Sequence, residues 1–303
     1  GYGDWNNLQV SGMTTLPLEK LHHVLQSLSG NNKAVAIEVS SHGLEQQRLA
    51  GVEFESAIFS NLTRDHLDYH GTMEAYGAEK AKLFTRKNLK YAIINADDDY
   101  AKHLIDVSLA QKTFSYGCAS TADLRFKIDR VHSLGLCVCF YWQGKEQQVE
   151  LPLYGEFNAY NVASVIAYCL LQGFSLEQTL SACSELKPVP GRMQQVIGKG
   201  KQPLVLVDYA HTPDALEQVL TSTKKHNKGR LILVVGCGGD RDQGKRPLMG
   251  KIAVENADKV IFTSDNPRSE APDFICQQMV EGLTGDFEIE LDRKQAIEKA
   301  ITQ

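Results

Sequence analysis

The sequence predicts an α/β protein of two domains: a central domain on a parallel sheet (residues 1–187) and a Rossmann-like domain (188–303). Apolar β-branched runs alternate with helical patterns along most of the chain, which is the order that produces parallel sheets covered by helices. KPVPGR (187–192) interrupts this order with two prolines and a glycine, and marks the domain boundary. A chain of 303 residues is long enough for two domains.

Three runs in the first domain predict buried parallel strands. KAVAIEVSS (33–41) is β-branched and apolar and ends in small polar residues, and FESAIFSNLT (54–63) and KYAIINADD (90–98) have the same character. Between the last two, MEAYGAEKAKLF (73–84) has helical spacing, which places Lys80 on an apolar helical face.

The rest of the first domain changes character. Residues 112–151 alternate over short distances with turn residues between, which predicts an antiparallel extension of the sheet. Its strands are DLRFKIDRV (123–131), GLCVCFYWQG (135–144) and KEQQVELPL (145–153). Helical patterns then return in NAYNVASVIAYCLLQG (158–173) and SLEQTLSACSEL (175–186).

Four strand–helix units follow the boundary and predict a small Rossmann-like domain. The strands are PLVLVDYA (203–210), RLILVVGCGG (230–239), KVIFTSDNP (259–267) and FEIEL (287–291). The helices after them are TPDALEQVLTSTKK (212–225), a helix from Lys245 to Asn256, APDFICQQMVEGL (271–283) and RKQAIEKAI (293–301).

Composition excludes several classes of protein. The net charge of −5, without a basic stripe, argues against nucleic acid as a partner. No apolar run approaches the ~20 residues that span a bilayer, and GYGDWNNLQV lacks the layout of a signal peptide. Seven scattered cysteines without CxxC pairs argue against a disulfide framework and a structural zinc site. We expect a cytoplasmic protein with no membrane or nucleic-acid partner.

Unusual polar residues collect where the predicted strands end. Ligands of open α/β sheets bind beyond the carboxyl ends of the strands. Those ends carry EVSSHG, SNLTRDHLDYHG, VDYAHTPDA, VVGCGGDRDQGKR and TSDNPRSE. We therefore expect the functional site at these ends.

Two of these ends suit a metal ion. Glu38 offers an anionic oxygen of the kind that Mg²⁺ prefers, although a loop or capping glutamate is the plainer alternative. TRDHLDYHG (63–71) is either a solvated charged loop or a place of metal and phosphate chemistry, and its position ahead of the Lys80 helix favours chemistry. A buried Lys80 would have a lowered pKa and a reactive neutral amine, whereas a surface lysine would extend into water.

The other motifs suit anions. The glycines of GCGGDRDQGKRP let backbone N–H groups approach a ligand, although the motif matches neither a Walker A loop nor GxGxxG. Arg268 follows a proline-fixed turn and could hold a carboxylate bidentately, or could be a solvated surface arginine. Asp208 and His211 precede a helix N-terminus, which either accepts negative charge or is only capped by Thr212 with Pro213.

Together these motifs resemble the Mur ligases of peptidoglycan synthesis, and most closely the diaminopimelate-adding branch of that family. The resemblance covers essentially the whole chain. It rests on EVSSHGL, NLTRDHLDYHG, YGAEKAKLF, GEFNAYN, PGRM, DYAHTPDAL, GCGGDRDQGKRPLMG and DNPR, in that order.

The resemblance implies an ATP-dependent amide ligase that requires Mg²⁺. Its substrates would be UDP-N-acetylmuramoyl-L-alanyl-D-glutamate and meso-diaminopimelate, and we expect it to act as a monomer. ATP would phosphorylate the D-glutamate carboxylate, and the amine of the diamino acid would attack the resulting acyl phosphate. Metal ions would neutralise phosphate charge, and domain closure would exclude water.

The resemblance also assigns roles to residues by motif. Mg²⁺ binding is implied for Glu38, His66 and Lys80, and catalysis for His66 and Lys80, the last matching the family's carbamylated lysine. Asp65, Asp68 and His70 would shape the loop or contact these ligands from behind. Muramoyl-dipeptide contacts are implied for Thr14, Thr15, Ser40, Gln46 and Arg48. ATP contacts are implied for Asn158, Arg192 and Asp208, with Asn158 near the adenine. The diaminopimelate site would comprise Arg241 and the turn Asp265, Asn266, Pro267 and Arg268.

The chain departs from the family pattern in four ways. It lacks a GTNGKT-type ATP loop, the amino-terminal uridine-binding domain and a carboxy-terminal GKGHE region, and Met13 replaces the usual asparagine before two threonines. We therefore expect a fragment that does not turn over ATP by itself. The alternatives are a lysine-adding ligase, a folylpolyglutamate synthetase, or a remnant that binds diaminopimelate without catalysis. The DNPR turn and EVSSHGL favour the diaminopimelate ligase over the first two.

Overall fold

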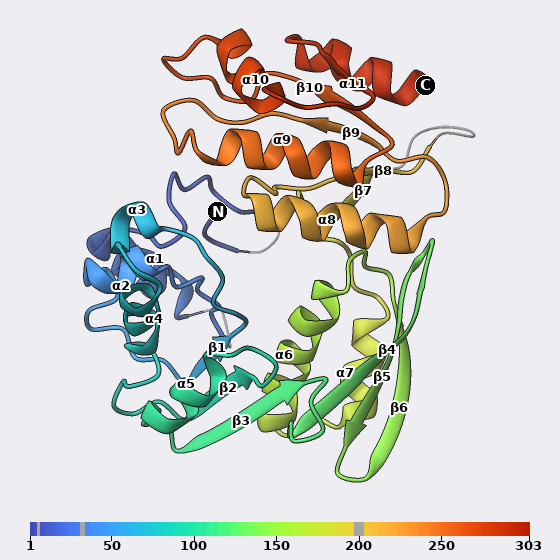
Figure 1. The fold of residues 1–303 in the computed structure, drawn as a ribbon. Coiled ribbons are helices and arrows are strands. Elements are labelled where there is room, and N and C mark those ends of the chain that lie inside the picture. The colour runs from blue at the N-terminus through green and yellow to red at the C-terminus, as the bar shows by residue number, and fades with distance from the viewer. Residues whose placement is uncertain (5–6, 31–33, 197–202) are drawn as a thin grey trace. The chain divides into compact units, whose positions relative to one another are not determined.

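The largest sheet has six strands in the order β1-β2-β3-β4-β5-β6 (Figure 1). Strands β1 to β4 are parallel, whereas β4, β5 and β6 are joined by two-residue turns, which only antiparallel neighbours allow. The antiparallel extension predicted for residues 112–151 is therefore present, after one further parallel strand, β3. The strands are β1 (Ser56–Phe59), β2 (Tyr91–Asn95), β3 (Lys112–Gly117), β4 (Leu124–His132), β5 (Gly135–Trp142) and β6 (Lys145–Leu151).

The computed structural model describes residues 1–4, 7–30, 34–196 and 203–303. The chain forms two compact units, and the division into domains at 187/188 stays a prediction. One unit comprises Gly1–Lys127, Phe140–Glu146 and Tyr160–Thr179. The other comprises Ile128–Cys139, Gln147–Ala159 and Leu180–Gln303. No helix within the described ranges is long and apolar enough to cross a membrane.

Helices account for much of the first half of the chain. The predicted helices at 73–84, 158–173 and 175–186 are all present, with ends shifted by a few residues. The helices are α1 (Leu18–Leu28), α2 (Ser41–Glu45), α3 (Leu67–His70), α4 (Met73–Ala81), α5 (Ala101–Val107), α6 (Phe157–Leu171) and α7 (Leu176–Cys183). Buried side chains from β1, β2, α4 and α5, among them Phe59, Ala81, Ile94 and Leu104, pack into one core.

The strand predicted at 33–41 was wrong. Residues 34–40 form neither strand nor helix, and residue 33 lies outside the described residues. The apolar residues of this run are exposed or only half-buried. An apolar run becomes a strand only where a neighbour pairs with its backbone, and within the described residues β1 pairs with β2 alone. Residues 34–40 still lead into α2, as the predicted strand end required.

The carboxy-terminal part contains a parallel sheet of three strands in the order β11-β10-β9, not the four that the sequence predicted. The strands are β9 (Ile232–Val235), β10 (Lys259–Phe262) and β11 (Phe287–Ile289). The fourth predicted strand, β8 (Val205–Val207), pairs antiparallel with β7 (Gln194–Val196) instead. A three-residue strand gains few ladder bonds, so a local antiparallel partner suffices to satisfy it.

All four predicted helices of this part are present. They are α8 (Pro213–His226), α9 (Lys245–Asn256), α10 (Pro272–Val280) and α11 (Arg293–Thr302). Helix α8 begins as predicted, with Thr212 Oγ1 accepting from Ala215 N at 3.4 Å and Pro213 in the first turn. Met249, Phe262 and Met279 are fully buried in the core between α9, α10 and the sheet. This packing holds the turns that follow β9 and β10 in place.

Candidate active site

Thr15 joins two of the predicted substrate-binding segments. Its hydroxyl donates to Glu38 O at 2.9 Å and accepts from Ser40 N at 2.9 Å. Ser40 Oγ lies 3.0 Å from that hydroxyl and accepts from Gly43 N at 3.1 Å, so it caps α2. Thr15 is 1% exposed, whereas Thr14 beside it is exposed. The structure thus brings Thr15, Ser40 and the Glu38 backbone together, with Thr14 the more accessible of the two threonines.

Arg48 and Gln46 extend this cluster through a chain of polar contacts. Arg48 Nη1 donates to Thr15 O at 3.0 Å, and its Nε donates to Gln46 Oε1 at 3.0 Å. Gln46 Nε2 donates to the hydroxyl of Tyr69 at 3.0 Å, which donates in turn to Glu45 Oε2 at 2.5 Å. Four of the predicted dipeptide-binding residues, Thr15, Ser40, Gln46 and Arg48, are therefore joined by hydrogen bonds, which also reach Tyr69 of the TRDHLDYHG loop.

His66 occupies a strained position at the start of α3. Its backbone is left-handed, with φ of 54°, a conformation that is uncommon for a residue other than glycine. Its N–H donates to Asp65 Oδ1 at 2.8 Å, and its Nε2 lies 3.5 Å from Asp65 Oδ2. Strain of this kind persists where surrounding contacts hold it, and it is common at functional sites. The side chain of Asp68 lies outside what the structure describes.

Three histidines and two tyrosines form a ring cluster around this loop. The His42 ring lies 4.9 Å from that of His66 and 4.0 Å from that of Tyr69. His70 stacks on Tyr76 at 5.3 Å, and its Nε2 lies 2.9 Å from Ser41 Oγ. These contacts pack the loop against α2 and α4. His70 therefore shapes the loop, as the sequence suggested.

Lys80 lies half-buried beside the same cluster. Its Nζ is 4.9 Å from the centre of the Tyr76 ring, which in turn lies 5.9 Å from the ring of His66. Burial lowers the pKa of Lys80, and the negative charges of Asp65 and Glu38 offset this only in part. Tyr76, buried at the same place, has a pKa raised to about 12. The structure thus places Lys80 within electrostatic reach of Glu38 and Asp65, in a site that favours a neutral amine.

These residues fit Mg²⁺ only if Lys80 becomes anionic. Within the described ranges, no three His, Cys, Asp or Glu side chains gather closely enough to hold a metal ion. The negative charges of Asp65 and Glu38 act instead on the Lys80 amine, and its ammonium form would repel a divalent cation. A carbamate on Lys80 would supply two oxygens and reverse that charge. The donor set would then suit a hard, oxygen-preferring cation.

Two of the three predicted ATP contacts lie on β7 and β8 or next to them. Asp208 Oδ2 accepts from Met193 N at 2.8 Å, and its Oδ1 accepts from Ala210 N at 2.8 Å. The guanidinium of Arg192 lies 5.5 Å from the ring centre of Tyr209, a cation–π contact on an exposed ring. Asp208 and Arg192 are therefore neighbours, held by the β7–β8 ladder.

Asn158, the third predicted ATP contact, lies in the first turn of α6. Its Nδ2 donates to Tyr154 O at 2.7 Å, so the side chain is fixed against the loop that precedes the helix. Asn158 with Tyr154 forms one group of contacts, and Arg192 and Asp208 with the β7–β8 ladder form another. What each group binds stays a prediction.

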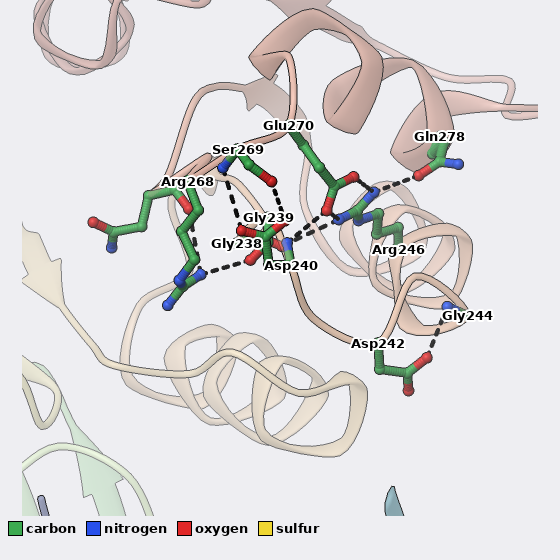
Figure 2. Close-up of polar contacts among 11 residues, drawn as sticks. Gly238, Gly239, Asp240, Asp242, Gly244, Arg246, Arg268, Ser269, Glu270 and Gln278 are labelled. Atoms are coloured by element: carbon green, nitrogen blue, oxygen red, sulfur yellow. Dashed lines mark hydrogen bonds and ion pairs between the residues drawn. The ribbon is translucent and has the colours of Figure 1, made fainter.

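The glycine-rich loop after β9 packs on the DNPR turn, as Figure 2 shows. Arg268 Nη1 donates to Gly239 O at 2.7 Å and to Asn266 O at 3.4 Å. A Cβ on Gly239 would lie 1.8 Å from Pro267 O, so only glycine fits there. A Cβ on Gly238 would meet Arg268 Nη1 at 2.9 Å and Arg241 Cγ at 3.9 Å, which places both arginines beside this loop.

Within the turn itself, Asn266 Nδ2 donates to Asp265 Oδ1 at 3.0 Å. Asn266 and Arg268 both have left-handed backbones, with φ of 45° and 52°. The Arg268 side chain is exposed, and one of its nitrogens is already engaged by backbone oxygens. A guanidinium has five N–H donors, so it can hold the loop and a ligand carboxylate together.

Arg246 fastens the same loop from the other side. It is 0% exposed, and it donates from Nη1 to Glu270 Oε2 and from Nη2 to Glu270 Oε1, both at 2.8 Å (Figure 2). It also donates to Gln278 Oε1 at 2.6 Å. Glu270 Oε1 accepts from Asp240 N at 2.6 Å, and Asp240 Oδ1 accepts from Ser269 Oγ at 2.6 Å. The predicted anion-binding role of the loop arginines therefore does not extend to Arg246, whose charge is neutralised internally.

Sequence reasoning missed the residues that support this site. Glu270 lies two positions after the DNPR turn. The available sequence signal was this acidic residue, which could pair with a basic residue of GKR (244–246). Tyr69 was visible in the loop motif but received no role. His226, in the last turn of α8, gave no sequence signal beyond a basic residue at a helix end.

The two halves of the chain match two consecutive family models. Residues 5–169 match the Mur ligase middle domain, and residues 191–303 match the Mur ligase glutamate ligase domain. A relative from Neisseria meningitidis serogroup B, named UDP-N-acetylmuramoyl-L-alanyl-D-glutamate–2,6-diaminopimelate ligase, is 43% identical over 314 aligned residues. The alignment covers 100% of this chain and 63% of that relative, so the chain spans less than two thirds of its length.

Solved structures agree with the sequence comparison. A structure titled UDP-N-acetylmuramoyl-L-alanyl-D-glutamate–2,6-diaminopimelate ligase is 41% identical, with a TM-score of 0.68 over 94% of this chain and 60% of that one. Folylpolyglutamate synthase from Thermotoga maritima is 17% identical, with a TM-score of 0.62 over 80% of this chain and 55% of that one, and shares the fold alone. The fold, the order of the motifs and both domain matches agree: the chain belongs to the Mur ligase family.

Proposed function

We propose that the protein is an ATP-dependent acid–amino acid ligase that joins meso-diaminopimelate to UDP-N-acetylmuramoyl-L-alanyl-D-glutamate. The observation that carries the proposal is the placement of Lys80 beside Glu38 and Asp65, in a site that lowers its pKa. A structural lysine would extend its ammonium to solvent. The name of the 43%-identical relative from Neisseria meningitidis supports this choice of substrates.

The reaction requires two transfers that balance without a redox partner. A carboxylate oxygen of D-glutamate attacks the γ-phosphorus of ATP, and the bond to ADP breaks. The diaminopimelate amine, after losing a proton, attacks the acyl carbon, and phosphate leaves with the electrons of the C–O bond. Catalysis of such transfers depends mainly on positioning and on neutralising charge.

Glu38, His66 and a carbamylated Lys80 would hold Mg²⁺. The ion would supply positive charge to the phosphate oxygens when bound. Asp65 fixes the orientation of His66 through the contacts of its two carboxylate oxygens with the backbone N–H and ring nitrogen. The lowered pKa of Lys80 increases the share of neutral amine, which is the form that reacts with carbon dioxide.

The turn at 265–268 would recognise diaminopimelate by the carboxylate that lysine lacks. Arg268 is held at one nitrogen by Gly239 O, which leaves its fork oriented by the protein before a ligand arrives. A preorganised guanidinium loses little freedom on binding a carboxylate. Arg241 lies beside the same loop and adds a second positive charge.

The other predicted contacts complete the proposal. Thr14, Thr15, Ser40, Gln46 and Arg48 would hold the muramoyl dipeptide, and the hydrogen bonds that join the last four support this proposal. Arg192, Asp208 and Asn158 would contact ATP. We further propose that the protein acts as a monomer in the cytoplasm, where the nucleotide-linked precursor and ATP are both present.

The test is an amide-forming assay with a choice of amino acid. The full-length protein is incubated with ATP, Mg²⁺ and UDP-N-acetylmuramoyl-L-alanyl-D-glutamate, and either meso-diaminopimelate or lysine, and products are identified by mass spectrometry. We expect an amide product with diaminopimelate and little with lysine. Equal rates would support a lysine-adding enzyme. Binding of diaminopimelate without product would support a non-catalytic remnant, as would the absence of a GTNGKT-type sequence upstream of Gly1 in the reading frame.

A further inference from the structure

A buried histidine at the end of α8 holds the loop that precedes α6. His226 is 4% exposed. Its Nε2 accepts from Gly155 N at 2.8 Å, and its Nδ1 lies 2.8 Å from His132 O. One side chain thus satisfies two buried backbone groups from segments far apart in the sequence.

These two contacts fix the protonation state of the ring. A backbone N–H can only donate, so Nε2 must be the unprotonated nitrogen. A carbonyl can only accept, so Nδ1 carries the proton. The imidazole is therefore neutral, and it is used as a donor on one side and an acceptor on the other. An apolar side chain at position 226 could neither donate nor accept these hydrogen bonds.

The loop that His226 holds has little freedom left. Gly155 has φ of 86°, with the Phe157 ring packed where a side chain would be. The Tyr154 ring lies 4.9 Å from that of His226, and its hydroxyl donates to Ser133 O at 2.7 Å. Glu156 pairs with Lys225, the neighbour of His226 on α8. Each residue from 154 to 157 therefore contacts either another residue of the loop or a residue outside it.

This loop sets the position of Asn158. The Asn158 side chain donates to Tyr154 O at 2.7 Å, so the peptide that His226 supports at Gly155 N also fixes the amide of Asn158. The contacts run from His226 to the 154–155 peptide and from that peptide to Asn158. No part of this path involves the diaminopimelate turn.

We propose that His226 is a positioning residue for nucleotide recognition: from α8 it fixes the 154–157 loop so that the Asn158 amide meets the adenine edge. The assignment rests on the proposed function, because only an ATP-dependent protein needs Asn158 in that place. An asparagine amide matches the adjacent N6 donor and N7 acceptor of adenine, whereas guanine presents two acceptors, O6 and N7, at the same edge. His226 therefore governs the preference for ATP over GTP rather than the affinity for phosphate.

Two amide replacements separate the two hydrogen bonds of His226. His226→Asn places an amide at the level of Nδ1, so it keeps the contact with His132 O and loses the acceptor for Gly155 N. His226→Gln reaches the level of Nε2 and keeps that acceptor. Dissociation constants for ATP and GTP are measured by calorimetry on the full-length protein, with Leu220→Ala, a buried position on the same helix, as a control for loss of stability.

We expect His226→Asn to lower the ATP-over-GTP ratio about tenfold, since misplacing a contact by ~1 Å can cost more than that. His226→Gln should keep the ratio within about threefold, and Leu220→Ala should not change it. Tyr154→Phe, which removes only the hydroxyl bond to Ser133 O, should give a smaller fall and serves if His226→Asn does not fold. An unchanged ratio in folded His226→Asn or Tyr154→Phe, or an equal fall in Leu220→Ala, would overturn the assignment. A wild type that binds neither nucleotide would refute the proposed function, and the assignment with it.

Discussion

Arg246 and Glu270 form a bidentate ion pair in which the guanidinium is completely buried, with both N–O distances at 2.8 Å. The pair joins the first turn of α9 to a residue two positions after the DNPR turn. Glu270 also accepts from Asp240 N, so one carboxylate ties the glycine-rich loop, the turn and α9 together. The Arg246 guanidinium holds the pKa of Glu270 down, to about 2.

Removing the charge of Glu270 should destabilise the carboxy-terminal half. Glu270→Gln leaves the Arg246 guanidinium buried without a counter-ion, so the thermal midpoint should fall by more than about 5 °C. The lowered pKa of Glu270 means that its stabilisation is complete above about pH 4.5 and is lost as the pH falls towards 2. Thermal unfolding across this range checks both effects. Glu281→Gln, at an exposed helix end, is the control, and an equal midpoint in the two variants would contradict the prediction.

Gly239 should tolerate no side chain. Gly239→Ala would place a methyl group 1.8 Å from Pro267 O, so the DNPR turn must move and the affinity for diaminopimelate should fall at least about tenfold. Gly244→Ala is the matched control, because Gly244 has φ of −63° and its added Cβ would meet only the mobile end of Asp242 at 3.2 Å. Calorimetric titration with diaminopimelate measures both. Equal affinities would show that the turn does not depend on this packing.

Arg268 should distinguish diaminopimelate from lysine. Arg268→Met removes charge-assisted hydrogen bonds worth about 1.5–3 kcal/mol, so the affinity for diaminopimelate should fall by about 10- to 100-fold. Affinity for lysine should hardly change, because lysine lacks the second carboxylate. Arg230→Met, an exposed arginine paired with Asp286, controls for the loss of a positive charge. A similar loss for both ligands would remove the role proposed for Arg268.

Lys80 should be essential and should carry a carbamate. Lys80→Ala should cost at least about 100-fold in amide formation, since even residues that only orient metal ligands cost 10–100-fold. Bicarbonate should not restore the activity. Labelled bicarbonate should give a carbamate carbon signal by NMR in the wild type that weakens as the pH falls, because the amine becomes protonated. Lys82→Ala, on the same helix but exposed and paired with Glu79, should retain both activity and signal. Full activity in Lys80→Ala would end the carbamate proposal.

His226 should make stability depend on pH below neutrality. Burial lowers the pKa of His226 from 6.5, and the hydrogen bond to the His132 carbonyl and the charge of Glu156 offset this only in part. The neutral ring is therefore the stable form, so its stabilisation is complete above about pH 6.5 and declines by up to ~1.4 kcal/mol per pH unit as the pH falls below it. His226→Gln cannot be protonated, so its unfolding free energy should fall less between pH 7.5 and 5.5. If the unfolding free energy fell equally with pH in the two proteins, His226 would not be a buried, neutral side chain in the folded protein.

Periodicity predicted the elements well where they pack through one apolar face. Helix α9 begins at Lys245 and ends at Asn256 as the sequence indicated, and β10 and β11 lie within their predicted runs. The strand predicted at 33–41 is absent over residues 34–40 because strand formation depends on a pairing partner, which composition cannot reveal. The same reason explains β8, which has strand composition but pairs with β7 rather than with β9.

The sequence by itself indicated the family, the helices α4 and α6 to α11, most of the strands, and the residue types at the carboxyl ends of the strands. These follow from local propensity and from motifs whose chemistry is written in their side chains. Only the tertiary structure decided that Lys80 is buried beside Asp65 and Glu38, that Arg246 is neutralised by Glu270, and that His226 supports the loop before Asn158. Burial and pairing depend on which segments meet in space, and His132 and His226, which meet here, are 94 positions apart.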